Sequence, residues 1–214
     1  MYFQLALVIL CMELRMADKN LNPMEQKVFD VSVNDNPANY NQLMGMMQTK
    51  YEQSPEMMQD IMNRIGFHET GHAQRMDPAA IQQVQGGGEG VGRGLFQFET
   101  GRDQGGATAM KRLRSVLRDM IPEGKLPAWT EFDPMFGVDA SKLTKEQQQM
   151  MFMANTLKHP TASFQGVNPD NVGEYWQNFH YAGPEDKRGL FDESMAAYNL
   201  KNTPTTEEKA FGSY

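Results

Sequence analysis

Apolar residues recur at steps of three and four along the first third of the chain, over Leu43, Met46, Met47, Tyr51, Met57, Met58, Ile61, Met62 and Ile65. This spacing predicts a helical face from Tyr40 to about Ile65. Pro55 predicts a break in it, with Ser54 as the N-cap of the second half. The spacing of the methionines marks them as core residues rather than ligands of a metal or cofactor.

Three later segments also carry helical signals. Residues 107–120 form an amphipathic pattern, whose Lys111, Arg112, Arg114 and Arg118 are most simply a solvated face, with anion binding as the alternative. Thr144 and Gln147 make a capping box that predicts a helix from there to about Lys158. Further helices are predicted over 170–181 and 186–199, and the stretch from 121 to 140 is predicted to be loop.

Between the second and third helical segments lies a glycine-rich stretch, "GGGEGVGRG", which cannot form a stable helix interior. The following "LFQFE", Leu95 to Glu99, alternates apolar and polar residues as a short strand does, which would place Gln97 and Glu99 on one face. The predicted fold class is therefore mainly α (α+β): a helical domain with one small glycine-rich β excursion.

The predicted organisation is a single domain over residues 40–200. Residues 1–39 form an apolar segment and an irregular lead-in, and 201–214 a polar tail. The apolar run from Tyr2 to Met12 is shorter than the roughly 20 residues of a membrane-spanning helix and lacks the features of a signal peptide. It is interpreted as a docking helix, a weak membrane anchor, or residues upstream of a true start at Met16.

Composition narrows the classes of function. Of the 214 residues, 40% are hydrophobic and 22% charged, an ordinary globular mixture, and the net charge is -7. An acidic chain argues against sequence-independent nucleic-acid binding and feels no long-range attraction to anionic polymers such as bacterial wall. The single cysteine, Cys11, excludes an internal disulfide and a CxxC metal cluster.

The segment His68-Glu69-Thr70-Gly71-His72 fits two kinds of catalytic site. As H-E-x-x-H it matches a zinc peptidase, which needs two histidines one helical turn apart, a glutamate base and a third ligand. The extended zinc motif requires Gly and His where this chain has Arg75 and Pro78. Downstream, only Glu89 and Glu99 remain as glutamate ligands, and Gly71 weakens a rigid helical platform. A zinc metallopeptidase therefore remains as an alternative.

The alternative interpretation, in which Glu69 is an acid catalyst, accounts for more features of the sequence than a zinc site does. It follows Ile65, Gly66 and Phe67 at the end of an apolar-faced helix. Burial disfavours the carboxylate, and the helix C-terminus also opposes negative charge, so both raise the pKa of this side chain. A carboxyl group kept protonated near neutral pH is what a glycosidase acid requires. The glycine run would let the backbone pass close to a chain of sugars.

These residues also carry a family resemblance. "HETG" followed by "GRGLFQFE" resembles the lysozyme superfamily, especially phage wall-degrading lysozymes. The chain is similar as well to chitinases with HETGG and YGRGxxQ motifs. It also resembles lytic transglycosylases, which have an E-[ST] acid, a G-L-x-Q segment and a late A-Y-N, here Ala197-Tyr198-Asn199. The resemblance covers residues 60–118 well and does not reach 1–40. Leu200-Lys201 stand where the transglycosylases continue A-G.

The resemblance implies a lysozyme-like fold in which Glu69 is the general acid, while Gln97, Glu99 and Gly94 line the cleft. Tyr198 and Asn199 would contact the sugar. Glu99 is the preferred second carboxylate, with Glu89 as its rival. Two carboxyls about 6.5–9.5 Å apart invert the anomeric centre and two about 5–5.5 Å apart retain it. A lytic transglycosylase works with one acid/base, because the 6-hydroxyl of the substrate attacks.

The predicted function is a phage peptidoglycan hydrolase or lytic transglycosylase that cuts between N-acetylmuramic acid (MurNAc) and N-acetylglucosamine (GlcNAc). It would need no metal or cofactor and would act from the virion, in the host periplasm or cell wall, while the genome enters. Expected partners are glycan strands and other virion proteins of the tail or internal core, not nucleic acid. A lysis-stage enzyme and a non-catalytic virion structural protein are the alternatives.

His68 is interpreted as structural, and helical spacing in "EYWQNFHYAG" favours core packing over sugar stacking for Tyr175, Trp176 and Tyr181.

Overall fold

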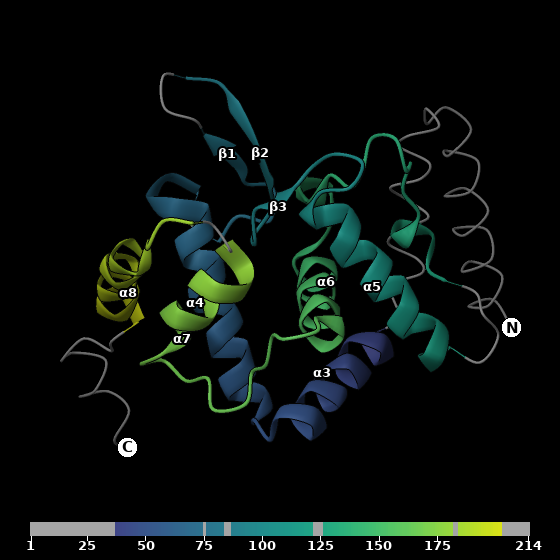
Figure 1. The fold of residues 1–214 in the computed structure, drawn as a ribbon, viewed down its shortest axis with the longest axis horizontal. Helices are drawn as coiled ribbons and strands as arrows, with labels where there is room; N and C mark the ends of the chain where they lie inside the picture. Colours follow the sequence, from purple (N-terminus) through teal and green to yellow (C-terminus); the bar gives the residue numbers. More distant parts are fainter. Residues whose placement is uncertain (1–36, 75, 84–86, 122–125, 182–183, 203–214) are drawn as a thin grey trace, which may run out of the picture.

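A computed structural model describes residues 37–74, 76–83, 87–121, 126–181 and 184–202, and it is mainly helical with one small sheet (Figure 1). The predictions for residues 1–36 and for most of the polar tail lie outside the described residues. Within that part of the chain no helix is long and apolar enough to span a bilayer. The predicted fold class, mainly α with a small β excursion, is confirmed.

The longer helices are α3 (Pro37–Tyr51), α4 (Pro55–Gln74), α5 (Gly105–Met120), α6 (Lys145–Lys158) and α8 (Arg188–Asn202). A four-residue helix α7 (Val172–Tyr175) runs into a π-helical turn, η4 (Trp176–Tyr181). There are two 3₁₀ turns: Ala128–Thr130 lies within the stretch 121–140 that was predicted to be loop, and Ala140–Lys142 begins at its last residue. The first of these buries Trp129.

Both predicted helix starts are confirmed at the level of individual hydrogen bonds. Ser54 Oγ accepts from the Met57 amide at 3.2 Å, which caps α4 after the break. At α6, Thr144 Oγ1 accepts from the Gln147 amide at 3.2 Å, and Gln147 Oε1 accepts from the Thr144 amide at 2.9 Å. These reciprocal bonds satisfy two backbone donors that a helix start leaves open, which fixes where α6 begins.

The β excursion is a three-stranded antiparallel sheet of β1 (Ile81–Gln83), β2 (Glu89–Arg93) and β3 (Phe98–Glu99), in the order β1-β2-β3. The strand predicted over 95–99 is wrong in extent, because only its last two residues pair with β2. Gln97 has a left-handed φ of 46° and lies in a turn. The alternation argument for Gln97 and Glu99 therefore fails.

The core is centred on α6, which packs against α5 and α3, while α4 packs against α8 (Figure 1). Residues 147–154 of α6 are buried on every side of the helix. Phe96 from the turn before β3 stacks on Phe152 of α6, with ring centroids 4.5 Å apart. This contact fixes the turn, and with it one wall of the pocket described below, to the most buried helix of the fold.

Candidate functional site

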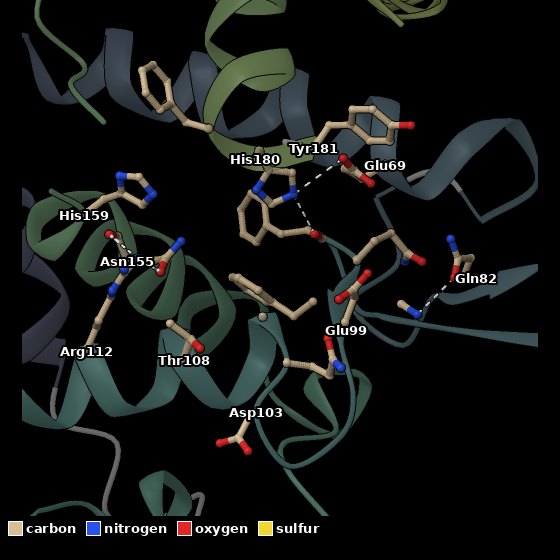
Figure 2. A pocket seen from close by; sticks show the side chains of 17 residues that line it. Glu69, Gln82, Glu99, Asp103, Thr108, Arg112, Asn155, His159, His180 and Tyr181 are labelled. Carbon is tan, nitrogen blue, oxygen red and sulfur yellow. Dashed lines mark hydrogen bonds and ion pairs between the residues drawn. The ribbon is translucent and has the colours of Figure 1, made fainter. Parts of the chain in front are cut away.

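A cleft of about 490 Å³ lies where α4, the sheet, α5, α6 and η4 meet (Figure 2). Its volume falls in the range of small-molecule sites. The lining is rich in groups that hydrogen-bond: three carboxylates, one arginine, two histidines, and several amides and hydroxyls, with Phe96, Phe98, Phe179 and Tyr181 between them. Glu69, Gln97 and Glu99 all line this one cleft. The other lining residues come from segments later in the sequence, α5, α6 and η4.

Glu69 is held against the inner wall, with 16% of its side-chain surface exposed. Trp176 Nε1 donates a hydrogen bond to its Oε1, and His180 Nε2 lies 3.5 Å from the same oxygen. Burial raises the pKa of Glu69, and the His180 charge and the Trp176 hydrogen bond oppose that rise without cancelling it. Burial thus favours the protonated form of this carboxyl, while the Trp176 N–H favours its anion.

The regular helix that carries Glu69 ends shortly after this residue. Gly71, with φ 61° and ψ −174°, interrupts α4 two residues after Glu69. An L-residue with a side chain is strained in that region, so glycine permits the sharp exit. Thr70 anchors it: its Oγ1 donates to Gly66 O at 2.7 Å and accepts from the Met76 amide at 2.8 Å.

The side of the cleft next to Glu69 is formed by the π-helical turn η4. A π-helical turn is wider than an α-helical one, so residues four and five apart lie on the same side of it. The rings of Trp176 and Tyr181 therefore stack, with centroids 5.2 Å apart and an interplanar angle of 22°. His180 Nε2 lies 2.8 Å from Phe96 O; since a carbonyl only accepts, Nε2 carries the proton. π-Helical turns occur frequently at functional sites.

Gln97 and Glu99 enter the cleft from the sheet side. Glu99 is exposed in β3, and Figure 2 shows it on a different wall from Glu69. Gln97 Nε2 donates to Gly94 O at 2.7 Å, while its Oε1 is buried and has no hydrogen-bond partner among the residues described. A Cβ at Gly92 would lie 2.7 Å from that oxygen, so glycine makes room for the Gln97 amide.

Gly94 does not line the cleft but closes the turn beneath it. Its φ is 75°, and a Cβ there would lie 2.2 Å from Gln148 Oε1. That oxygen accepts from the Leu95 amide at 2.6 Å. The glycine is thus needed for close approach of the turn to α6, not for approach of the backbone to a sugar. Glu89 is also outside the cleft: it is 63% exposed and pairs with Arg93 at 3.4 Å.

Tyr198 and Asn199 lie on α8 and face α4 rather than the cleft. Tyr198 donates to Asp60 Oδ1 at 3.2 Å and packs edge-on against Phe67, at 5.3 Å between ring centroids. Asn199 Oδ1 accepts from Arg64 Nη1 at 3.1 Å. The late A-Y-N segment therefore joins α8 to α4, behind the helix face that carries Glu69.

The geometry around His68 is that of a structural histidine. Its Nδ1 lies 2.9 Å from Ser194 Oγ, and its ring packs against Trp176 and Phe191. Burial lowers its pKa to about 4, and the charge of His180 adds to that. Gly71 breaks the helix between His68 and His72, so the regular one-turn spacing of a zinc platform is lost. The described side chains, which do not include His72, contain no group of three or more potential metal ligands.

Several cleft residues were not predicted from the sequence, notably His180, Thr108, Asn155 and His159. Arg112, interpreted as part of a solvated face, is half-buried and lines the cleft. Trp176, for which core packing was favoured over sugar stacking, is buried and donates a hydrogen bond to Glu69. The order W-x-x-x-H-Y brings Trp176, His180 and Tyr181 to one side of the chain only in a π-helix, so it would have indicated a site only if a π-helix had been expected.

Comparisons with models of protein families, with curated proteins and with solved structures found no match.

Proposed function

We propose that this protein is a glycosidase of the lysozyme or lytic transglycosylase type, which cuts peptidoglycan between MurNAc and GlcNAc with Glu69 as the general acid. The observation that carries the proposal is the state of Glu69: a largely buried carboxyl, with a raised pKa, on the wall of a cleft rich in hydrogen-bonding groups. Its place in the "HETG" motif supports the same role. We further propose that it acts from the phage virion in the host periplasm or cell wall.

The environment of Glu69 suits both halves of proton transfer. Before the reaction, burial favours the protonated carboxyl, which can deliver its proton to the bridging oxygen of the glycosidic bond. As the proton leaves, the Trp176 N–H already donates to the oxygen on which negative charge develops, and His180 Nε2, whose proton donates to Phe96 O, lies 3.5 Å from that oxygen. Preorganised donors of this kind stabilise the product carboxylate without rearrangement.

The second step depends on what attacks the sugar. In a hydrolase a second carboxylate positions or activates the water, and Glu99 is the glutamate that shares the cleft with Glu69. In a lytic transglycosylase the 6-hydroxyl of the muramic acid attacks, and one acid/base suffices. The two routes leave different ends on the released sugar, so the products distinguish them.

The test is digestion of purified wall sacculi, followed by mass spectrometry of the soluble fragments. We expect GlcNAc–MurNAc units with intact stem peptides, ending in reducing MurNAc for a hydrolase or 1,6-anhydroMurNAc for a transglycosylase. New free amino groups with uncut glycan would indicate a peptidase and contradict the proposal. Intact sacculi under conditions where a reference lysozyme digests them would favour a structural virion protein instead.

A change at Trp176 should alter the pH dependence in a defined direction. The Trp176 hydrogen bond favours the carboxylate and so lowers the pKa of Glu69. In Trp176→Phe that stabilisation is lost, the pKa of Glu69 rises further, and the acid stays protonated to higher pH. We therefore expect the alkaline limb of the kcat/KM profile to move to higher pH.

The other tryptophan supplies the matched control. Trp129 is also buried, at 6% exposure, but it lies in the 3₁₀ turn 128–130 and does not line the cleft. Trp129→Phe should lower stability by a similar mechanism, loss of buried aromatic surface, and leave the alkaline limb in place. A limb that moves to lower pH in Trp176→Phe, or moves equally in both variants, would contradict the assigned role.

A further inference from the structure

Arg112 lines the cleft and forms no ion pair with a carboxylate among the described residues. Four described arginines pair with acidic side chains: Arg64, Arg93, Arg102 and Arg188. Arg112 instead donates from Nη1 to Asn155 Oδ1 at 2.6 Å and to Asn155 O at 3.4 Å. Its Nε and Nη2 have no acceptor among the residues that the structure describes. These two atoms form the edge of the guanidinium that binds a carboxylate with two parallel hydrogen bonds.

Arg112 also lies where a ligand in the cleft could reach it. Arg112 is half-buried and is the one arginine or lysine among the described residues that line the cleft. Figure 2 shows it with Thr108, Asn155 and His159 at the end of the cleft away from Glu69 and Tyr181. Asn155, on α6, fixes the guanidinium across the gap between α5 and α6. A fixed planar cation loses little freedom when it binds an anion.

The acidic group of the cleft lining that is nearest to Arg112 in the sequence is already occupied by other cations. The nearest acidic member of the lining by sequence, Asp103, is exposed and lies 3.5 Å from Lys111 and 3.7 Å from Arg102. The positive charge of Arg112 also helps to lower the pKa of His159, after burial. An anionic group of a ligand would thus meet one positive charge at this end of a protein whose net charge is -7.

We propose that Arg112 binds a carboxylate of the stem peptide that the muramic acid carries, and so selects peptide-bearing wall glycan over neutral glycan. The inference rests on the proposed function and deepens it. It assigns the two ends of the cleft to different parts of one substrate: the glycosidic bond at Glu69 and the anionic branch at Arg112. Neutral chitin has no carboxylate and gains nothing from the second end.

The experiment measures binding on a Glu69→Gln background, so that no ligand is cleaved. Isothermal titration compares a GlcNAc–MurNAc disaccharide with its stem peptide and a neutral chitin oligosaccharide. Adding Arg112→Gln should weaken binding of the peptide-bearing fragment about tenfold or more, as expected for loss of a charge-assisted pair, and leave chitin binding unchanged. Arg112→Lys, which keeps the charge without the fork, should fall between the two.

Arg118→Gln is the matched control, because Arg118 is an exposed arginine on the same helix and does not line the cleft. It should bind both ligands as the background protein does. Equal weakening of both ligands by Arg112→Gln, or no weakening, overturns the inference while the glycosidase proposal stands. A wild-type protein that releases no glycan fragments and a background protein that binds neither ligand overturn both together.

Discussion

Glu69→Gln is expected to reduce the release of wall fragments by about 10²–10⁴-fold, the usual contribution of a general acid. Glutamine has nearly the same shape as glutamic acid and can still accept the hydrogen bond from Trp176 Nε1, which Glu69 Oε1 accepts now. It has no proton to deliver to a glycosidic oxygen. The measurement is the initial rate of soluble MurNAc release from sacculi, with Glu193→Gln, an exposed glutamate on α8, as the control.

Stability separates this loss of activity from misfolding. Burial raises the pKa of Glu69 above its ordinary value of 4.5. A raised carboxyl pKa gives stability that is full below pH 4.5 and is lost as pH rises through the folded-state value. Glutamine has no carboxyl group to ionise, so the variant does not lose this stability as pH rises. Glu69→Gln should therefore be at least as resistant to urea as wild type at neutral pH. An active, stable Glu69→Gln protein would contradict the assignment.

Gln148→Leu is expected to lower the free energy of unfolding by about 3 kcal/mol, a large effect for one substitution. Gln148 is fully buried. Its Oε1 accepts from the Leu95 amide at 2.6 Å, and its Nε2 donates to Pro78 O at 2.8 Å and Leu143 O at 2.9 Å. Leucine fills similar space but leaves these three backbone groups without a partner.

Urea unfolding at pH 7 measures the effect, and Gln165→Leu is the control, because Gln165 is exposed. The control should change stability by less than about 0.5 kcal/mol. The rate of wall-fragment release is a second readout. The turn that Gln148 holds includes Phe96, whose carbonyl accepts a hydrogen bond from His180 in the cleft. Unchanged stability in Gln148→Leu would show that the three bonds contribute little to the fold.

The helices could be predicted from the sequence because their signals are local. Ser54 and the Thr144–Gln147 pair act within one turn of their own helix, and the structure confirms both. The strand over 95–99 could not be predicted correctly, because a contact distant in sequence decides it. Gln148 binds the Leu95 amide, and this holds residues 94–97 in a turn where alternation alone favours a strand.

The same distinction applies to the site. Glu69, Gln97 and Glu99 were predicted from a short motif and its resemblance, and the fold brings all three to one cleft. Tyr198 and Asn199 were chosen from three letters, and their contacts with α4 depend on how α8 docks. His180 and Arg112 were not assigned to the site, because nothing local distinguishes a cleft histidine or arginine from a surface one.

The π-helical turn gives the cleft an unusual kind of sensitivity. It differs from an α-helix by one additional residue per turn, and that residue sets the directions of Trp176, His180 and Tyr181. A deletion of one residue within it would restore the ordinary spiral and rotate this trio apart, while α3 to α6 keep their own packing. Chain length at this one point, and not side-chain chemistry alone, therefore sets the geometry of this side of the cleft.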